Sequence, residues 1–166
     1  MEGAKVTKIP TPSYTLSSGH TIPLIGLGTD GIQNADVISK AIVEIGYRLI
    51  DTASRYKNEQ AGGQGVNLAL QSGRVSREEM FIVTKVWIDE VEDVESACRR
   101  SLGRLGLEYV DLYLLHWPIS VREVPQEDGS ASYEKLKIPI HKIWPQLESL
   151  FDKGLAKSIG VSNFNV

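Results

Sequence analysis

Apolar residues along the chain follow two different spacings, and the two alternate. Short apolar runs are followed by segments in which apolar residues return every three or four positions. Ile38, Ala41, Ile42 and Ile45 form the first such helical segment, and Gly46 supplies its stop. The predicted strands occupy residues 24–28, 47–51, 81–85, 110–115 and 156–161. Helices are predicted after the first four strands, near residues 38–45, 58–70, 91–105 and 143–151.

This order of strands and helices predicts an α/β fold with a parallel sheet, either open or curled into part of a barrel. Residues 13–23 come before the first strand and alternate apolar and polar positions about Ser18-Gly19, which predicts an N-terminal β-hairpin. Residues 118–139 are polar and longer than a usual connection, so we expect a long loop there between a strand and its helix. Residues 1–166 are expected to form a single domain.

Charge and cysteine content narrow the partners and compartments that fit the chain. Its 166 residues include 18 Lys or Arg and 21 Asp or Glu, a net charge of −3 without a basic run, so we expect no nucleic-acid partner. No stretch approaches the roughly 18 apolar residues of a membrane span, and the first residues lack the apolar core of a secretion signal. Cys98 is the single cysteine, which fits a reducing compartment. We therefore expect a cytoplasmic protein without a membrane partner.

A glycine motif near the N-terminus suggests one candidate function. Gly26-Leu27-Gly28-Thr29-Asp30-Gly31 matches GxGxxG, and Asp51 lies 20 residues beyond Gly31 at the end of the next predicted strand. This is the pattern of a Rossmann-type dinucleotide-binding domain, in which a helix N-terminus holds the pyrophosphate. Helical periodicity begins only near Asp36, however, so the helix dipole would miss the phosphates. The glycines are better explained by the exit from a strand.

Polar groups capable of chemistry stand at the ends of successive predicted strands. Asp51 ends the second strand, Lys85 ends the third, His116 follows the fourth and Ser162-Asn163 follow the fifth. In a parallel barrel these carboxyl ends form one face, where the loops build the active site. Tyr56 lies five residues beyond Asp51 and can fold back over the same opening. Each residue alone has a structural explanation, but together they converge on one rim.

The combination of residues on this rim suits the reduction of a carbonyl group. A free phenol has a pKa near 10 and is a poor proton donor at neutral pH unless a cation lies beside it. Lys85 can supply that cation next to Tyr56, and Asp51 can fix the lysine by an ion pair. His116 can donate a hydrogen bond that orients the carbonyl. The hydride must come from a cofactor, because no side chain provides one.

Four stretches of the sequence resemble the aldo-keto reductase family. Residues 46–59, GYRLIDTASRYKNE, look like that family's first signature, and residues 112–118, LYLLHWP, look like the strand that carries its histidine. Residues 84–87, TKVW, and 159–164, IGVSNF, match two further stretches. The resemblance covers nearly the whole chain. It implies a (β/α)8 TIM barrel and the NADPH-dependent reduction of an aldehyde or ketone to an alcohol.

The resemblance also implies roles for individual residues. Tyr56 would be the catalytic proton donor, and Lys85, Asp51 and His116 would complete the catalytic tetrad. Residues expected beside the cofactor, NADPH with NADH as the alternative, are Gly28, Thr29, Asp51, Ser162 and Asn163. Residues expected beside the substrate, a small carbonyl compound, are Trp87, His116 and Trp117. No metal-binding residues are expected.

The chain departs from the family pattern in three respects. The predicted elements stop after five parallel strands, so we expect a partial barrel, truncated before the last three βα units of the family fold. Gly62 and Gly65 stand inside the second helix, where each glycine costs roughly 0.5–1 kcal/mol relative to alanine. Asp30 replaces the aromatic or apolar residue that is common after Gly-Thr in the family.

Two classes of function therefore remain. The first is an NADPH-dependent carbonyl reductase, and the second is a truncated, non-catalytic relative that acts as a binding or interaction protein. A half-barrel would leave its first and fifth strands without outer neighbours, and such edges recruit other strands. We therefore also expect self-association or a C-terminal complementing segment.

Overall fold

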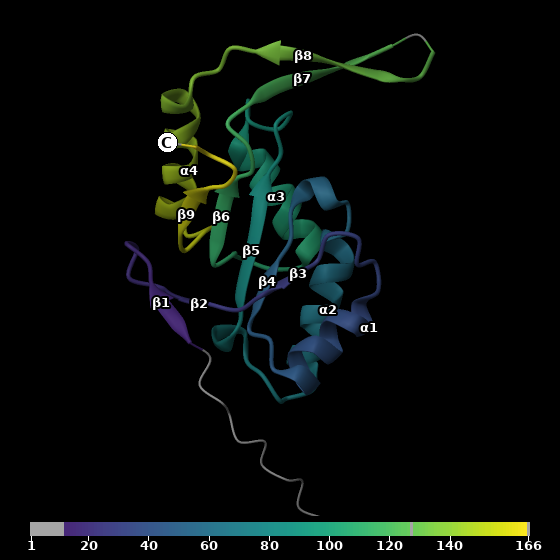
Figure 1. The fold of residues 1–166 in the computed structure, drawn as a ribbon, viewed down its shortest axis with the longest axis vertical. Helices are drawn as coiled ribbons and strands as arrows, with labels where there is room; N and C mark the ends of the chain where they lie inside the picture. Colours follow the sequence, from purple (N-terminus) through teal and green to yellow (C-terminus); the bar gives the residue numbers. More distant parts are fainter. Residues whose placement is uncertain (1–11, 127, 166) are drawn as a thin grey trace, which may run out of the picture.

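A five-stranded parallel sheet forms the centre of the computed structural model, which describes residues 12–126 and 128–165. Its strands lie in the order β3-β4-β5-β6-β9, and every neighbouring pair is parallel (Figure 1). The strands span β3 (Leu27–Gly28), β4 (Leu49–Asp51), β5 (Phe81–Val86), β6 (Leu112–Leu115) and β9 (Ile159–Val161). The predicted parallel α/β order is confirmed, although most strands are shorter than their apolar runs.

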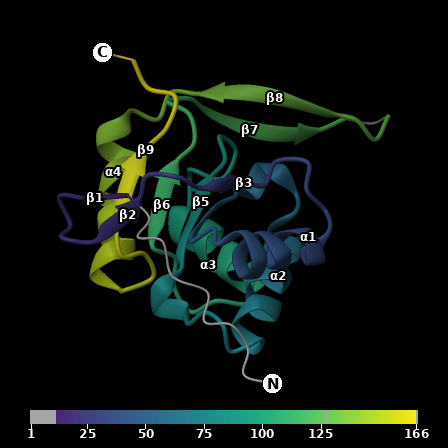
Figure 2. The same cartoon turned by 60° about the horizontal axis from the view of Figure 1, so that its bottom comes forward.

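Helices cover one face of this sheet (Figures 1 and 2). They are α1 (Ala35–Lys40), which continues as a π-helical turn over Ala41–Ile45, α2 (Glu59–Gln71), α3 (Val94–Leu105) and α4 (Ile140–Asp152). Asn34 caps α1 by accepting a hydrogen bond from the Asp36 N–H at 2.8 Å, and Gly46 ends the helix with a φ of 96°. Gly31 lies in a turn outside the helix, so this loop lacks the geometry of the dinucleotide-binding fingerprint. No helix in the described part of the chain is long and apolar enough to cross a membrane.

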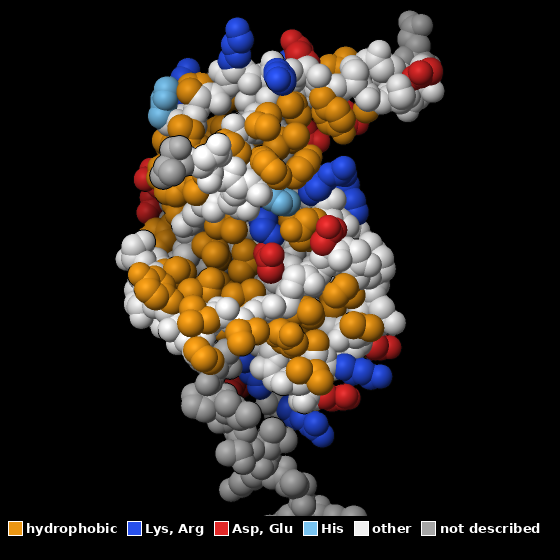
Figure 3. All heavy atoms as spheres, viewed as in Figure 1, with side chains coloured by type: hydrophobic (Ala, Val, Ile, Leu, Met, Phe, Trp, Pro, Cys, Tyr) orange, Lys and Arg blue, Asp and Glu red, His pale blue; other side chains and the backbone are white. Residues whose placement is uncertain are grey.

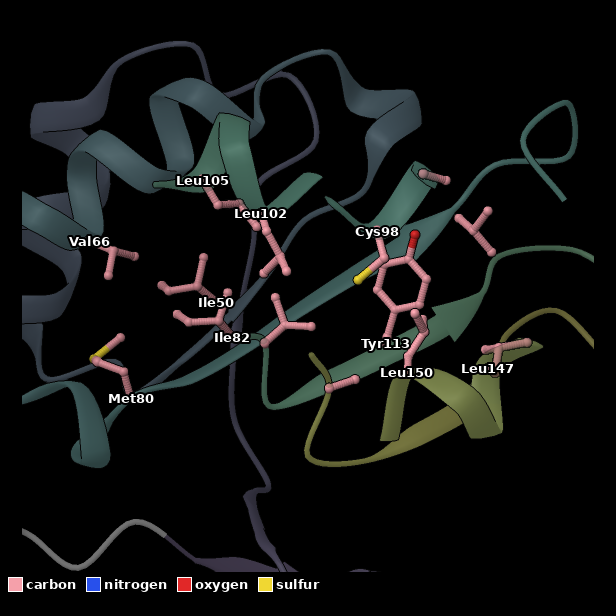
Figure 4. Packing of buried hydrophobic residues seen from close by; sticks show 14 of the residues in the cluster. Ile50, Val66, Met80, Ile82, Cys98, Leu102, Leu105, Tyr113, Leu147 and Leu150 are labelled. Atoms are coloured by element: carbon pink, nitrogen blue, oxygen red, sulfur yellow. The ribbon is translucent and has the colours of Figure 1, made fainter. Parts of the chain in front are cut away.

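The hydrophobic core lies between the sheet and the helices (Figure 4). Alternation along β6 shows how the sheet separates its two faces: Tyr113 and Leu115 are fully buried in the core, whereas Leu112 and Leu114 on the other face are half-buried. The core side chains labelled in Figure 4 are Ile50, Val66, Met80, Ile82, Cys98, Leu102, Leu105, Tyr113, Leu147 and Leu150.

Glycines within α2 allow the helices to pack closely, which corrects part of the expectation from the sequence. A Cβ atom at Gly65 would lie 2.7 Å from the Ala35 carbonyl oxygen and 2.7 Å from Cβ of Ile38 in α1. A Cβ atom at Gly63 would lie 2.0 Å from the Leu105 carbonyl oxygen. Gly62 has room for a side chain, because its nearest neighbour would be 3.9 Å away. Gly65 therefore lowers the helix propensity of α2, but it also allows α1 and α2 to pack closely.

Two antiparallel hairpins flank the main sheet. The first pairs β1 (Ser13–Thr15) with β2 (Thr21–Pro23) and confirms the predicted N-terminal hairpin. Its turn contacts the segment before β9 through a hydrogen bond of 2.7 Å between the hydroxyl groups of Ser18 and Ser158. The second pairs β7 (Ser120–Pro125) with β8 (Ala131–Leu136) and extends from the body of the molecule (Figure 1). The segment 118–139 is therefore a hairpin for much of its length, where the sequence predicted an extended loop.

The strand register brings the predicted reactive residues to one edge of the sheet. Asp51 is the last residue of β4 and pairs with Val83, while Lys85 lies two residues further along β5. His116 directly follows β6, and Ser162 directly follows β9. All four strands point in the same direction, so these side chains meet at the carboxyl ends of the strands, as in a parallel barrel.

Candidate active site

Lys85 is a buried cation at the centre of the site. Its Nζ donates to Asp51 Oδ1 at 2.6 Å and to the Thr52 carbonyl oxygen at 2.9 Å. The same Nζ lies 3.4 Å from the Tyr56 hydroxyl oxygen and 5.0 Å from the centroid of that ring. The predicted association of Asp51, Lys85 and Tyr56 is therefore present in the structure.

Tyr56 reaches the lysine because the chain turns sharply after β4. Residues Ser54–Tyr56 form one 3-10 turn, and Lys57 ends it in the left-handed region with a φ of 56°. Asn58 then ties this turn to the loop after β3, because its buried amide donates to the carbonyl oxygens of Thr29 and Ile32. The phenol is held half-buried at the rim.

Glu59 anchors the end of the same turn, a role that no sequence pattern indicated. Its carboxylate is buried and accepts hydrogen bonds from the Thr84 hydroxyl at 2.6 Å and from Nε of Arg104 at 2.7 Å. Thr84 precedes Lys85 in β5, so this pairing fixes the start of α2 against the strand that carries the cation. A glutamate at a helix start is usually exposed, and its burial depends on a partner 45 residues away.

His116 completes the group of four residues. Its ring is buried and lies edge-on to Tyr56, with centroids 5.8 Å apart, and edge-on to Trp87 at 5.0 Å. Burial, followed by the charge of Lys85, lowers the pKa of His116 below its ordinary value of 6.5, against the opposite effects of Asp51 and Asp30. The imidazole is therefore neutral at pH 7 and can donate one hydrogen bond to a bound group.

The residues after β9 have hydrogen-bonding groups that fit a carboxamide. Asn163 adopts a φ of 60°, and its amide nitrogen donates to the His116 carbonyl oxygen and to the Ser162 hydroxyl, both at 2.9 Å. This leaves Oδ1 of Asn163 as an acceptor and the Ser162 hydroxyl as a donor. A nicotinamide carboxamide presents the complementary N–H and C=O groups.

Thr29 and Gly28, which are predicted to lie beside the cofactor, have different environments. Thr29 is fully buried, and its backbone N–H and its hydroxyl both donate to the Asp51 carbonyl oxygen, at 2.9 and 3.0 Å. Its side chain therefore holds the end of β4 and has its donor already occupied. Gly28 faces open space, because a Cβ atom there would meet nothing within 4 Å.

Glu90 connects the loops that follow β4 and β5, and the sequence did not indicate this either. Its carboxylate accepts hydrogen bonds from the Ser54 hydroxyl at 2.6 Å, from the Trp87 N–H at 3.2 Å and from Arg100 at 3.2 Å. Burial raises the pKa of Glu90, but these hydrogen bonds outweigh burial and hold the pKa below its ordinary value. The hydrogen bonds of Glu90 therefore hold Trp87 beside the turn that contains Tyr56.

Trp117, the other predicted substrate contact, is 39% exposed at the rim.

The four grouped residues open onto one face of the molecule. Figure 3 shows histidine, basic and acidic side chains together near the centre of this face, bordered by hydrophobic side chains.

A family model described as the aldo/keto reductase family matches residues 25–166. The chain belongs to this family. The alternative prediction of a Rossmann-type dinucleotide-binding domain, which the GxGxxG motif suggested, is therefore wrong.

Two curated members of the aldo/keto reductase family illustrate the relationship. A probable NAD(P)H-dependent D-xylose reductase of Arthroderma otae is 41% identical over 170 residues, covering 95% of this chain and 52% of the relative. An NADH-dependent D-xylose reductase of Candida parapsilosis is 41% identical over 174 residues, covering 96% of this chain and 53% of the relative. The chain thus spans about half the length of the curated relatives it matches.

Solved aldo/keto reductase structures confirm the partial barrel. The aldose reductase from Schistosoma japonicum superimposes with a TM-score of 0.82 at 38% identity, covering 93% of this chain and 54% of that one. A Bombyx mori aldo-keto reductase in complex with NADP gives a TM-score of 0.79 at 39% identity, covering 95% and 52%. Five parallel strands and four helices of the barrel are therefore present among the described residues.

Proposed function

We propose that this chain carries the catalytic groups of an NADPH-dependent reductase that converts aldehydes or ketones to alcohols. The observation that carries the proposal is the position of Lys85 Nζ, 2.6 Å from Asp51 Oδ1 and 3.4 Å from the Tyr56 hydroxyl oxygen. A buried cation beside a phenol stabilises the phenolate that forms when the phenol gives up its proton. The kinship with NAD(P)H-dependent xylose reductases supports this reaction class.

The proposed mechanism divides the work among four side chains. His116, neutral and donating through its ring N–H, binds the carbonyl oxygen and polarises the carbonyl group. When bound, NADPH supplies the hydride that the carbonyl carbon accepts. The electron pair of the C=O bond moves to oxygen, which takes the proton from the Tyr56 hydroxyl. Lys85 stabilises the resulting phenolate, and Asp51 holds Lys85 in place by their ion pair.

The cofactor would be oriented by groups after β9 and at the end of β3. Ser162 and Asn163 offer a donor and an acceptor to the nicotinamide carboxamide, and Gly28 leaves space beside Asp51. We assign NADPH as the cofactor, with NADH as the alternative, because the relatives use one or both and the Bombyx mori structure contains NADP. Trp87, in contact with His116, is proposed to line the substrate pocket together with Trp117.

The direct test separates a reductase from a non-catalytic binding or interaction protein. NADPH fluorescence is titrated with the purified chain, and NADPH consumption is then followed with an aromatic aldehyde. A reductase changes the fluorescence and consumes NADPH with formation of an equal amount of alcohol. The absence of both changes would contradict the proposal and favour the non-catalytic function.

We also propose that the two edges of the sheet are covered by a second copy of the chain or by a C-terminal complementing segment. Within the described residues, β3 and β9 each have a partner strand on one side alone. Unpaired backbone groups on such edges favour strand pairing.

A further inference from the structure

Arg55 places a positive charge beside the proposed reaction site. It directly precedes Tyr56 in the 3-10 turn, and its guanidinium carbon lies 5.4 Å from the centroid of the Trp87 ring. The same indole contacts His116, with centroids 5.0 Å apart. Arg55 therefore contacts a ring that itself contacts His116, and it is joined to Tyr56 by one peptide bond. In Figure 3, basic side chains lie beside the histidine near the centre of this face.

The guanidinium of Arg55 has hydrogen-bonding capacity to spare. Within residues 12–126 and 128–165 it pairs with no carboxylate, and its contact is the face of Trp87. Several other arginines pair with carboxylates, as Arg100 does with Glu90 and Arg104 does with Glu59. An arginine stacked on an aromatic ring keeps the N–H groups at its edge free, and these form paired hydrogen bonds with a carboxylate.

Four carboxylates border the hollow that Arg55 and Trp87 line, and within the described residues none of them is paired with Arg55. Glu59 is occupied by Thr84 and Arg104. Glu90 is occupied by Ser54, Trp87 and Arg100. Burial and the neighbouring Glu90 raise the pKa of Asp89. Glu123 lies exposed on β7.

Asp30 sets the direction in which an anionic substrate would lie. It follows β3, on the far side of Tyr56 from Trp87 in the strand order, and its charge acts on His116. Asp30 repels an anionic group on the β3 side, whereas on the Trp87 side Arg55 offers a guanidinium that no carboxylate occupies among the described residues. A carbonyl held at Tyr56 and His116 would therefore direct its anionic end toward Arg55.

We propose that Arg55 selects carbonyl substrates that also carry a carboxylate, and that it binds this carboxylate against Trp87. The inference rests on the proposed reductase function, because it assigns the substrate class of that site. It assigns Arg55 to substrate selection, and the proton transfer remains with Tyr56.

The binding test compares 4-formylbenzoate with 4-formylbenzamide, which has the same aldehyde and ring but no charge. The Nε–H resonance of Arg55 is identified in an arginine-labelled NMR spectrum by its loss in Arg55→Gln. We expect formylbenzoate to shift this resonance and formylbenzamide to leave it in place. Lys57→Gln removes the cation that follows Tyr56 in the sequence, as Arg55 precedes it, and serves as the matched control, in which the shift is retained. Equal shifts with both compounds, or no shift with formylbenzoate, would overturn the inference.

The kinetic test uses the same two aldehydes with NADPH. We expect the ratio of kcat/KM for formylbenzoate over formylbenzamide to fall about tenfold in Arg55→Gln, to fall less in Arg55→Lys, and to be retained in Lys57→Gln. An unchanged ratio in Arg55→Gln would overturn the role of Arg55 while leaving the reductase function in place. Failure of the unmodified chain to reduce either aldehyde would contradict the proposed function, and the NMR comparison would still support or overturn carboxylate binding by Arg55.

Discussion

At the scale of single residues, the environment of the buried His116 controls its charge. Burial and the charge of Lys85 lower the pKa of His116. As pH falls below 6.5, the unfolded chain takes up this proton before the folded chain does. The stability associated with His116 is therefore complete above pH 6.5 and is lost as pH falls from that value through the lower pKa of the folded state.

Removing the charge of Lys85 should raise the pKa of His116. Lys85→Met deletes the repulsive ammonium group and leaves Asp51 unpaired, and both changes favour the protonated imidazole. The pKa is measured from the pH dependence of the imidazole NMR signals. We expect a higher value in Lys85→Met than in the unmodified chain. An equal or lower value would show that Lys85 does not control the charge of His116.

Tyr113 is a second residue whose burial leads to a measurable effect. Its side chain is fully buried beside Cys98 (Figure 4), and its hydroxyl has no hydrogen-bond partner among the described residues. Burying a hydroxyl without a partner costs about 1–3 kcal/mol. We expect Tyr113→Phe to raise the free energy of unfolding by about 1 kcal/mol in urea titrations.

The matched control for this substitution is Tyr133→Phe, because Tyr133 is 57% exposed on β8. Because this side chain is exposed, the free energy of unfolding should change little in Tyr133→Phe. A loss of stability in Tyr113→Phe alone would mean that the buried hydroxyl has a partner in solution.

At the scale of elements, glycines in α2 have opposite effects that the sequence alone could not separate. Gly62→Ala should raise the free energy of unfolding by roughly 0.5–1 kcal/mol, because alanine favours the helix and its Cβ has room. Gly65→Ala should lower it by about 1–3 kcal/mol, because its Cβ would collide with Ala35 and Ile38 in α1. Chemical denaturation measures both. Stabilisation by Gly65→Ala would show that the two helices can move apart at no cost.

The order of the elements and the positions of the rim residues could be predicted, because both follow from local sequence patterns. The nearly continuous apolar run before His116 indicates a buried parallel strand, and the turn after Asp51 follows directly from the sequence. The hairpin of β7 and β8 could not be predicted, because most of its residues are exposed and it lacks an apolar alternation. Glu59 and Glu90 were missed because each has a partner distant in the sequence: Arg104 donates to Glu59, and Ser54 donates to Glu90.

At the scale of the whole molecule, the sheet has one face covered by helices and two edges without a neighbour among the described residues. Apolar side chains line the open regions: Leu24 is 62% and Val161 is 42% exposed. Large exposed apolar patches and free strand edges both favour association. We expect the 166-residue chain to self-associate. Light scattering should give a concentration-dependent mass above the monomer mass of 18.3 kDa.

Calorimetry complements the measurement of mass. If the open edges are covered by a second copy, the unfolding temperature should rise with chain concentration. A monodisperse species of 18.3 kDa with one reversible transition independent of concentration would instead show that the five-stranded sheet is self-sufficient.

We propose that Tyr56 gives its proton to a carbonyl oxygen beside the buried Lys85–Asp51 pair. Tyr56→Phe removes the hydroxyl and keeps the aromatic ring, so packing and cofactor affinity should change little. The most direct measurement is the rate of NADPH consumption with a saturating aldehyde, compared between the unmodified chain and Tyr56→Phe at equal NADPH occupancy. We expect turnover in the unmodified chain and a loss of at least about a hundredfold in Tyr56→Phe. A near-normal kcat in Tyr56→Phe would contradict the assignment of Tyr56 as the proton donor.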